Sequence, residues 1–397
     1  MIALLACAPA TLAPGDLAAV PDAAGPGLAP ALADRDADWV VDCEGDEDFE
    51  TIGDAVAAAD DGDVLAVHAC TYAETVDFAG KSLAIHGAGA DVTTIEADRG
   101  SATVVVQSGE TDGTLLSGFT LTGGSNDYGS AIFVDLSSLR VEDSVLTDNS
   151  GWATVFASSG DVELDGVTIE DNSARGGAEV YGSRGSLVIT NSTISCDGSS
   201  YGMYASHGSA AVDWSTFHCD GAYATAWEHA IGRVMRTHHE GGLYSYQEED
   251  HYDDAVYVEN DVITGDVMAQ YGAIVMRNSL VVGATSLSLI SADYTVLEGN
   301  VFTSGRCAIT TDVEGLAIRY NDFWDTTPLC QGPDLIGVDG NIDDDCAFVD
   351  FEGGDYTLSR GSPCEDAGPP EDERDDVDGS PNDIGVYGGI RSLGGGW

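Results

Sequence analysis

The sequence predicts an all-β solenoid, in which successive coils stack into a parallel β-helix. One phrase recurs ten times between Thr114 and Gly332: a short β-branched run, a small or polar residue, then a second apolar run. Self-similarity at a spacing of about 20 residues is typical of stacked single-coil repeats. The ten small or polar anchor residues are Gly118, Ser144, Gly166, Ser192, Ser215, His239 in a degenerate copy, Asp261, Ser279, Asn300 and Asn321.

Within each phrase, residues alternate between apolar and polar side chains, which is the period of a strand and not of a helix. A single coil cannot bury its apolar side, whereas stacked coils bury a continuous core and pair their backbones from coil to coil. A β-propeller would need about 40 residues per unit, so the spacing favours the solenoid.

The amino-terminal region reads as an export signal followed by a tether. Leu4, Leu5, Ala6 and Cys7 resemble the end of a bacterial lipoprotein signal, which predicts lipidation of Cys7. A full signal has a longer apolar stretch, so residues 1–7 would be a remnant or an accidental match. Residues 8–38 are rich in Ala, Pro and Gly without periodicity, as expected for a flexible tether.

A capping segment is expected to open the β-helix, which we place at residues 39–335. Thr51 can cap a short helix that runs to Ala59, Gly62 and Asp63 end it, and Val64 begins a strand. The segment contains TIGDAVAAA, GDVLAV, TYAE and GKSLAIHG. These motifs resemble the amino-terminal cap of the pectate-lyase-like superfamily, and the resemblance implies a right-handed parallel β-helix.

The carboxy-terminal segment, residues 336–397, reads as an Asp-rich module. GNIDDDCAFVDFEGGDYTLSRGSPCEDAG and DVDGSPNDIGVYGG resemble the choice-of-anchor module of secreted bacterial β-helix proteins. Cys346 and Cys364 stand where that module usually has proline and alanine, and this paired departure favours a disulfide between them. The resemblance implies an architecture more than an activity, because the superfamily includes lyases, hydrolases, esterases, epimerases and non-catalytic surface proteins.

Eight of the nine cysteines suggest an exported, oxidised chain. Cys196 and Cys219 occupy the same place in consecutive phrases, so stacking would bring them about 4.8 Å apart. A zinc site is the alternative, although no Cys-x-x-Cys spacing occurs. Sequential pairing predicts the disulfides Cys43–Cys70, Cys196–Cys219, Cys307–Cys330 and Cys346–Cys364.

The charge balance limits the partners. With 14 Lys and Arg against 69 Asp and Glu, the formal net charge is −55. Nucleic acid is therefore excluded as an expected partner, and a membrane is expected only through a lipid anchor on Cys7. A polysaccharide or cell-surface glycan is the partner that we expect.

Calcium is the one cofactor that the residues suggest. The acidic loop that contains Asp376, Asp378 and Asp383 places oxygens at alternate positions around Gly379, like half of a calcium loop. The closing glutamate of an EF-hand is absent, so a solvated turn is the alternative. Asp253 and Asp254 are a second candidate pair of ligands.

The degenerate coil is the candidate catalytic region, because broken patterning often marks function. Between Trp227 and Asp254 it combines aromatic residues, both charge signs and four of the eight histidines. An enzyme acting on acidic polysaccharide needs a positive charge or a cation, a base and an acid. The residues that offer these roles are Arg233, Arg236, His238, Asp250 and His251. A long, solvated outward loop is the alternative.

Aromatic side chains offer a third possibility, stacking on sugar rings near the fifth and sixth coils. The candidates are Trp152, Trp214, Trp227, Tyr201, Tyr204, Tyr223 and Tyr244. Interior packing would account equally well for isolated members of this group.

These patterns lead to one functional hypothesis with an alternative. The first is a secreted or lipid-anchored, non-catalytic protein at the cell or outer-membrane surface that binds carbohydrate or other surfaces. The alternative is a Ca²⁺-assisted polysaccharide lyase, glycoside hydrolase or uronate epimerase with its site near residues 227–254. A purely structural surface-layer component is a third reading.

Overall fold

The computed structural model describes residues 36–97, 99–175, 177–196, 201–247, 255–283, 287–292, 294–303 and 305–389. Cys7 and the tether up to residue 35 lie outside the described residues. Among the helices of the described part, none has the length and apolar character needed to cross a bilayer.

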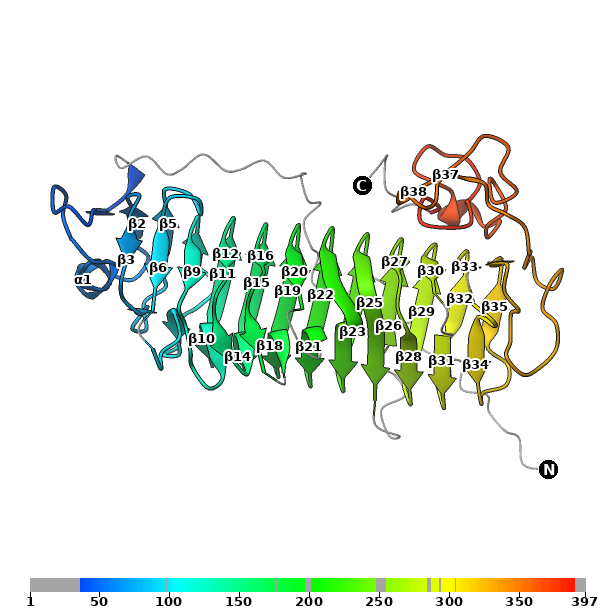
Figure 1. Cartoon of the computed structure of the whole chain (residues 1–397), viewed down its shortest axis with the longest axis horizontal. Coiled ribbons are helices and arrows are strands. Elements are labelled where there is room, and N and C mark those ends of the chain that lie inside the picture. Colours follow the sequence, from blue (N-terminus) through cyan, green and yellow to red (C-terminus); the bar gives the residue numbers. More distant parts are fainter. Residues whose placement is uncertain are drawn as a thin grey trace, which may run out of the picture.

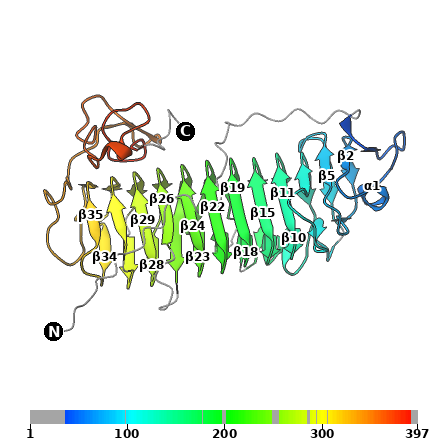
Figure 2. The same cartoon turned by 180° about the vertical axis from the view of Figure 1, so that it is seen from behind.

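The chain forms an elongated parallel β-helix, as the repeats predict (Figure 1). Each coil contributes strands to three faces, and every strand pairs in parallel with its counterpart one coil away. The first face is a 13-stranded sheet, and many of its strands are labelled in Figure 2. Its strands are β1 (Trp39–Val41), β2 (Val64–Val67), β5 (Ala84–Gly87), β8 (Leu115–Ser117), β11 (Ser138–Glu142), β15 (Asp161–Asp165), β19 (Ser186–Thr190), β22 (Ser209–Asp213), β24 (Ile231–Met235), β26 (Ala255–Glu259), β29 (Ala273–Arg277), β32 (Val296–Glu298) and β35 (Ala317–Arg319).

The second and third faces are joined because β23 and β25 are long enough to run through both. The second face comprises β3 (Thr71–Tyr72), β6 (Thr94–Glu96), β9 (Thr120–Thr122), β12 (Val145–Leu146), β16 (Thr168–Ile169), β20 (Thr193–Ser195), β23 (Thr216–Glu228), β25 (His238–Tyr246), β27 (Val262–Ile263), β30 (Leu280–Val282), β33 (Val301–Thr303) and β36 (Asp322–Trp324). The third face comprises β4 (Val76–Asp77), β7 (Val104–Val106), β10 (Gly129–Asp135), β14 (Ala153–Ser158), β18 (Ala178–Ser183), β21 (Tyr201–Ser206), the second halves of β23 and β25, β28 (Val267–Gln270), β31 (Leu287–Ile290) and β34 (Ile309–Thr311).

A short helix covers the amino-terminal end of the core, as the sequence predicts. α1 (Ile52–Ala58) begins after Thr51, whose Oγ1 accepts a hydrogen bond from the Asp54 amide at 3.1 Å. The chain's single lysine, Lys81, completes the other end. Its Nζ donates to the carbonyl oxygens of Val56 at 2.6 Å and Ala59 at 2.8 Å, which satisfies acceptors that the helix leaves unpaired.

The first corner, between the first and second faces, carries a ladder of polar side chains. At each turn one residue adopts a positive φ, for example Asn191, Arg236 and Asn260. Where the next residue is Ser, Asp or Asn, its side chain accepts the backbone N–H of its counterpart one coil earlier. Asn300 Oδ1 accepts from the Ser279 amide at 3.0 Å, while its amide group donates to the Met276 carbonyl. The ladder therefore satisfies corner backbone that the strands leave unpaired.

Strand register corrects three anchors of the sequence repeat. Gly118 and Gly166 are counterparts of Asp143, one residue before the ladder position. His239 is the counterpart of Phe217, and the ladder position of this coil belongs to Thr237, whose amide donates to Asp261 Oδ1 at 2.7 Å. The His239 ring is fully buried and stacks on Phe217, with centroids 5.6 Å apart. In the described part of the degenerate copy, histidine thus replaces an apolar interior residue, and its polar character misled the alignment.

The carboxy-terminal segment folds back over the last coils (Figures 1 and 2). It contains the antiparallel pair β37 (Phe348–Asp350) and β38 (Asp355–Leu358) and a short 3₁₀ helix (Asp372–Arg374). Outward apolar side chains of the second face form a common core with those of the segment. The members of this core are Val262, Leu280, Val301, Cys346, Tyr356, Cys364, Ile384 and Val386.

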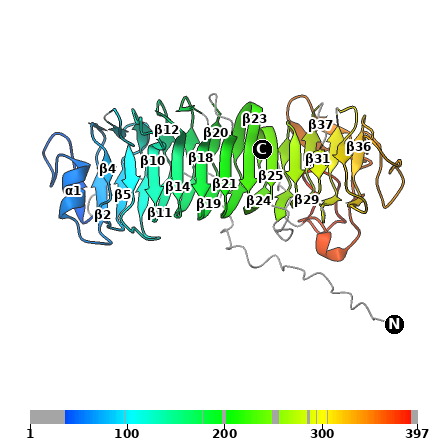
Figure 3. The ribbon, with the colours of Figure 1, turned by 90° about the horizontal axis from the view of Figure 1, so that it is seen from below.

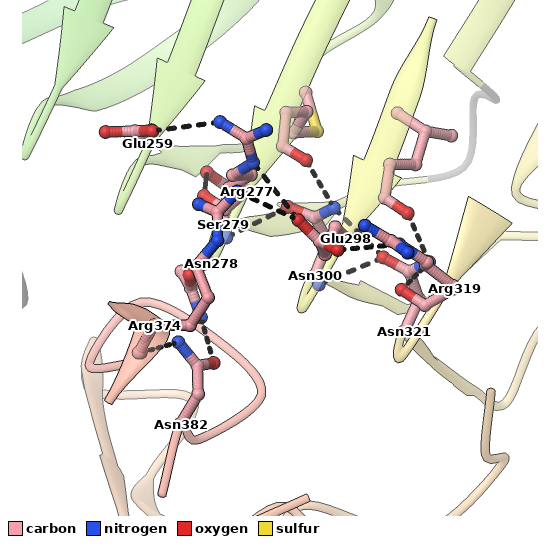
Figure 4. A network of polar contacts seen from close by, with 12 residues as sticks. Glu259, Arg277, Asn278, Ser279, Glu298, Asn300, Arg319, Asn321, Arg374 and Asn382 are labelled. Atoms are coloured by element: carbon pink, nitrogen blue, oxygen red, sulfur yellow. Dashed lines mark hydrogen bonds and ion pairs between the residues drawn. The ribbon is translucent and has the colours of Figure 1, made fainter. Parts of the chain in front are cut away.

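A buried carboxylate strengthens this junction (Figure 4). Glu298 is 2 % exposed and forms ion pairs with Arg277 at 3.2 Å and Arg319 at 2.7 Å from the coils. Arg374 of the carboxy-terminal segment approaches the same carboxylate to 3.7 Å. Three cations around one buried anion compensate for its lost hydration, so the segment is held by charge as well as by apolar contact.

All four disulfides expected from the sequence are present. Cys43–Cys70 ties the first turn, and Cys196–Cys219 and Cys307–Cys330 each link consecutive coils. Cys346–Cys364 closes a loop inside the carboxy-terminal segment. Disulfides of this number are typical of an oxidising environment.

Asp261 generates a prediction about stability and pH. This ladder carboxyl is fully buried, and burial raises its pKa well above the ordinary value of 3.8. The folded chain therefore retains a proton that the unfolded chain releases, so stability falls as pH rises above about 4. We expect Asp261→Asn to raise the unfolding temperature at pH 7 and to change it little at pH 4. The control Asn300→Asp should lower stability at pH 7, and equal effects of Asp261→Asn at both pH values would contradict the assignment.

His239 generates the opposite pH dependence. Burial lowers the pKa of His239 from 6.5 to about 3, and neither ring nitrogen has a hydrogen-bond partner among the described residues. Between these values the unfolded chain binds a proton that the folded chain excludes, so stability falls as pH decreases, by at most about 1.4 kcal/mol per pH unit. We expect His239→Phe to stabilise the protein more at pH 5 than at pH 8, measured by chemical denaturation. Phe217→His should steepen the loss in acid, and a pH-independent effect of His239→Phe would refute this account.

Candidate functional site

The candidate catalytic residues of the coil between Trp227 and Asp254 are distributed over different elements. Arg233 lies on β24 of the first face, opposite Ala211 and Tyr257. Arg236 lies at the first corner, and His238 begins β25 on the second face. Asp250, His251, Asp253 and Asp254 lie outside the described residues. The described members therefore occupy three successive parts of the coil.

Arg236 has a structural partner. Its guanidinium forms two hydrogen bonds with the carboxylate of Asp213, which is buried. The same guanidinium lies over the ring of Trp214, 4.9 Å from its centroid. A bidentate ion pair together with a cation–π contact fixes this arginine against its own corner.

His238 belongs to a small polar group on the outer side of the second face. Burial is the main cause that lowers the pKa of His238, while Glu240 raises it and His218 lowers it further. His218 Nδ1 lies 2.6 Å from Glu240 Oε2. This group holds a histidine and a carboxylate together, but Arg233 on the first face does not share its surface.

The candidate calcium residues bind the backbone of their own loop. Asp376 accepts from the amides of Asp383 at 3.2 Å and Gly389 at 2.5 Å. Asp378 accepts from the Ser380 amide at 3.0 Å, and Asp383 from the Asp366 amide at 2.7 Å. Among the described residues, three metal-type ligand atoms converge only elsewhere, at a group that contains Asp322. The loop acids therefore act in this structure as acceptors of backbone amides.

The third face carries a ladder of stacked aromatic rings. Phe133, Phe156, Tyr181 and Tyr204 occupy equivalent outward positions on β10, β14, β18 and β21, which lie side by side in Figure 3. Consecutive ring centroids are 5.7, 5.2 and 5.7 Å apart, with interplanar angles of 2°, 14° and 15°. Rings stacked along the solenoid axis turn their faces toward one another, so solvent meets mainly their edges.

Two further rings lie across this ladder. Trp152 packs edge-on against Tyr181, with centroids 4.7 Å apart and planes at 75°. Tyr128 is tilted by 52° to Phe156 at 5.6 Å. Tyr128 is 60 % exposed and Trp152 is 36 % exposed. Because they cross the ladder, these two rings can present a face to a ligand, and the ladder beneath them limits their movement.

A pocket with a volume of about 830 Å³ opens beside Trp152. It lies at the second corner, where the chain passes from the second face to the third. Charged, hydroxyl and amide side chains line it together with one aromatic ring. The lining residues are Glu96, Ala97, Arg99, Gly123, Gly124, Ser125, Asn126, Asp127, Asp148, Ser150, Gly151, Trp152 and Arg175.

Asparagine and glycine residues shape this corner. Asn149 Oδ1 accepts from the Gly124 amide at 2.9 Å, and the Asn149 amide group donates to the Leu121 carbonyl at 2.9 Å. Asn172 repeats the arrangement one coil later, because its Oδ1 accepts a hydrogen bond from the backbone N–H of Asn149 at 3.0 Å. A Cβ on Gly124 would lie 1.9 Å from the Ser130 carbonyl oxygen, so only glycine allows this close approach. The short pair β13 (Ser150–Gly151) and β17 (Ser173–Ala174) continues the wall.

The pocket is a place where a strongly acidic chain presents positive charge to solvent. Arg99 and Arg175 line it, and both are exposed. Arg175 donates to Ser150 Oγ at 2.8 Å, which directs its guanidinium along the pocket wall. Glu96, Asp127 and Asp148 bring carboxylates to the same space. The pocket thus combines both charge signs, hydrogen-bonding groups and one aromatic ring.

A second aromatic group follows the ladder toward the carboxy terminus. Tyr201 stacks with Tyr223 at 6.1 Å, and Tyr223 contacts Tyr244 at 5.4 Å. Tyr204 hydrogen-bonds to Glu228, and burial, followed by this bond, raises the pKa of Tyr204. The third face is therefore aromatic over several consecutive coils.

The sequence analysis identified some of the aromatic residues on the third face and missed others. Of the rings singled out as sugar-stacking candidates, Trp152, Tyr201, Tyr204, Tyr223 and Tyr244 lie on the third face or at its edge. Trp227 is fully buried inside the coil and is therefore out of reach of a sugar, and Trp214 lies at the first corner beneath Arg236. Phe133, Phe156, Tyr181 and the pocket were missed. Their recurrence at one outward position per coil was the available signal.

Comparisons with known proteins give limited likenesses. No protein-family model and no curated protein sequence matches the chain. Among solved structures, pectate lyase Pel9A is similar at 13 % identity and a TM-score of 0.40, over 85 % of this chain and 90 % of that one. Pectin methylesterase from carrot is 13 % identical with a TM-score of 0.31, over 75 % and 84 %. The Agl-KA catalytic domain is 12 % identical with a TM-score of 0.30, over 76 % and 67 %.

Proposed function

We propose that this protein is an exported, non-catalytic β-helix protein that binds carbohydrate at the third face, in the pocket beside Trp152. One observation carries the proposal: an exposed indole, held across an aromatic ladder, forms a wall of a pocket whose other walls are polar. Sugars present apolar C–H faces and hydroxyl rims, and such a pocket offers a partner for each.

The polar lining suits hydroxyl recognition. Asn126, Ser125 and Ser150 offer amide and hydroxyl groups that both donate and accept hydrogen bonds. Arg99 and Arg175 add donors without acceptor capacity, while the carboxylates act as acceptors. A ligand rich in hydroxyl groups can therefore satisfy the lining in several ways, and the aromatic wall selects for a flat apolar face.

The position of the pocket favours an extended glycan over a single sugar. The ladder and the tyrosines Tyr201, Tyr223 and Tyr244 continue the aromatic surface along the solenoid axis. A linear chain bound at Trp152 would pass over these successive coils. Each coil would then add a small contact, and the contacts would sum along the chain.

The cellular setting completes the proposal. Four disulfides support an oxidising compartment, and lipidation of Cys7 would attach the protein to a membrane through the 8–38 tether. The carboxy-terminal segment, with its own share of a core, would serve as an anchor-type module at a cell surface. Calcium has no assigned role at the third face.

A second candidate function uses the same pocket. Three carboxylates, from Glu96, Asp127 and Asp148, line a space that also contains Arg99 and Arg175. Paired carboxyl groups are the machinery of glycoside hydrolysis, and an arginine stabilises negative charge. This observation favours a polysaccharide hydrolase or lyase at the second corner over one at the coil of residues 227–254.

Binding is tested by removing the indole. We expect Trp152→Ala to weaken retention on the recognised polysaccharide by about tenfold, because the ring supplies the stacking face. Affinity electrophoresis against linear uronate-containing and neutral polysaccharides measures the dissociation constant. The matched control is Tyr294→Ala, which removes an aromatic ring that is 70 % exposed away from the pocket. No retention of the wild-type protein on any glycan, or equal losses in both variants, would defeat the proposal.

Catalysis is tested in the same panel by assaying reducing ends and unsaturated products. The binding proposal predicts no turnover by the wild-type protein. Turnover that falls at least about a hundredfold in Asp148→Asn, with unchanged unfolding temperature, would replace binding by catalysis at the pocket. Turnover that instead survives Asp148→Asn and disappears in His238→Ala would return the site to the coil of residues 227–254.

A further inference from the structure

A buried acid interrupts an apolar row at the junction between the solenoid and its carboxy-terminal segment. Val262, Leu280, Val301 and Asp322 occupy equivalent outward positions on β27, β30, β33 and β36. The segment covers this row and excludes solvent from it. Asp322 is fully buried like its apolar neighbours. An aliphatic side chain would continue the row without the cost of burying a carboxyl group.

The contacts of Asp322 leave one of its oxygens facing sulfur. Oδ1 accepts a hydrogen bond from the Asp344 amide at 3.0 Å. Oδ2 lies 3.2 Å from Cys346 Sγ and 3.9 Å from Cys364 Sγ. These two sulfurs form a disulfide, which has no proton to donate. In the oxidised protein, Asp322 Oδ2 therefore receives no hydrogen bond from the two sulfur atoms. This contact points to a different role for the carboxylate when the disulfide is reduced.

The three side chains have the arrangement of a metal-ligand set. One carboxylate oxygen and two sulfurs, all buried, lie within 4.8 Å of one another. Zn²⁺ is held by thiolates at about 2.3 Å and by carboxylate oxygens at about 2.1 Å, which places ligand atoms a few ångströms apart. Thiolates favour zinc over calcium or magnesium. The Asp344 amide would orient the carboxylate from behind, as partners outside the ligand set commonly do.

We propose that Asp322, Cys346 and Cys364 bind one zinc ion when the Cys346–Cys364 disulfide is reduced. A dithiol or phosphine reductant supplies two electrons, the S–S bond breaks, and each sulfur takes up one proton. Zinc then displaces both thiol protons to water and binds the two thiolates and the carboxylate. A disulfide oxidant reverses the sequence by accepting two electrons, whereupon the S–S bond forms again and Zn²⁺ is released.

The two states connect the molecule differently. The disulfide joins two positions within the carboxy-terminal segment, whereas zinc also joins the segment to β36 through Asp322. Zinc thereby cross-links the segment to the last coil in the reduced chain. This cross-link predicts that zinc stabilises the reduced chain and leaves the oxidised chain unaffected.

The test uses the full chain, reduced with a phosphine under anaerobic conditions and then mixed with zinc and desalted. We expect about one zinc per chain by elemental analysis, an increase in unfolding temperature, and a thiolate charge-transfer band when Co²⁺ replaces zinc. The oxidised chain should retain none. Asp322→Asn should weaken zinc binding by about tenfold or more, and Cys346→Ser with Cys364→Ser should abolish it.

A matched control removes a different disulfide, whose cysteines do not belong to the group that contains Asp322. The double variant Cys307→Ser with Cys330→Ser should bind zinc as the wild-type chain does. Zinc content that is unchanged by Asp322→Asn and by the Cys346 and Cys364 substitutions would overturn the proposal. If reduction unfolds the chain and zinc restores neither its circular dichroism nor its cooperative unfolding, the proposal is overturned as well.

Discussion

Backbone pairing from coil to coil is the constraint on which the rest of this structure depends. Each strand pairs in parallel register with its counterpart, at a spacing of about 4.8 Å. A residue type that recurs at one position of the repeat must therefore stack on itself. The interior aliphatic rows, the polar corner ladder and the aromatic ladder of Phe133, Phe156 and Tyr181 all follow from this one requirement. Both proposed sites lie where a stack is crossed or broken, at Trp152 and at Asp322.

The same constraint decides which polar residues the interior tolerates. Asn300 and Asn321 are stable inside because each amide both accepts and donates within its ladder. Asp261 occupies the same ladder but offers only acceptors unless it is protonated. His239 takes an interior aromatic position and finds a ring to stack on but no hydrogen-bond partner among the described residues. Register places these side chains inside regardless of their chemistry, and their protonation adapts.

The sequence predicted the periodic parts of the molecule and failed where spatial neighbours decide. Alternation and spacing were enough for the parallel β-helix and for the Cys196–Cys219 pair, since these depend on position within the repeat. The α1 cap followed from local capping residues, and the remaining cysteine pairs followed from sequential order. His239 was misaligned because a polar residue filled an apolar position. Trp227 was a candidate for sugar stacking with interior packing as the alternative, and register turns it inward. The pocket escaped prediction because its lining comes from loops of several coils, with Glu96, Asn126 and Arg175 far apart in the chain. Asp322 showed no signal until folding brought it to Cys346.

The cations of the chain differ in whether they pair with a buried carboxylate. In a chain with 14 basic and 69 acidic residues, a free arginine is attracted to many competing carboxylates. Arg236 pairs with Asp213, and Arg277, Arg319 and Arg374 gather around Glu298, so these positions compensate buried anions. Arg99 and Arg175 instead line an open pocket beside an exposed indole. The proposal of carbohydrate recognition at the second corner rests on this combination of exposed guanidinium groups, carboxylates and an exposed indole around one pocket.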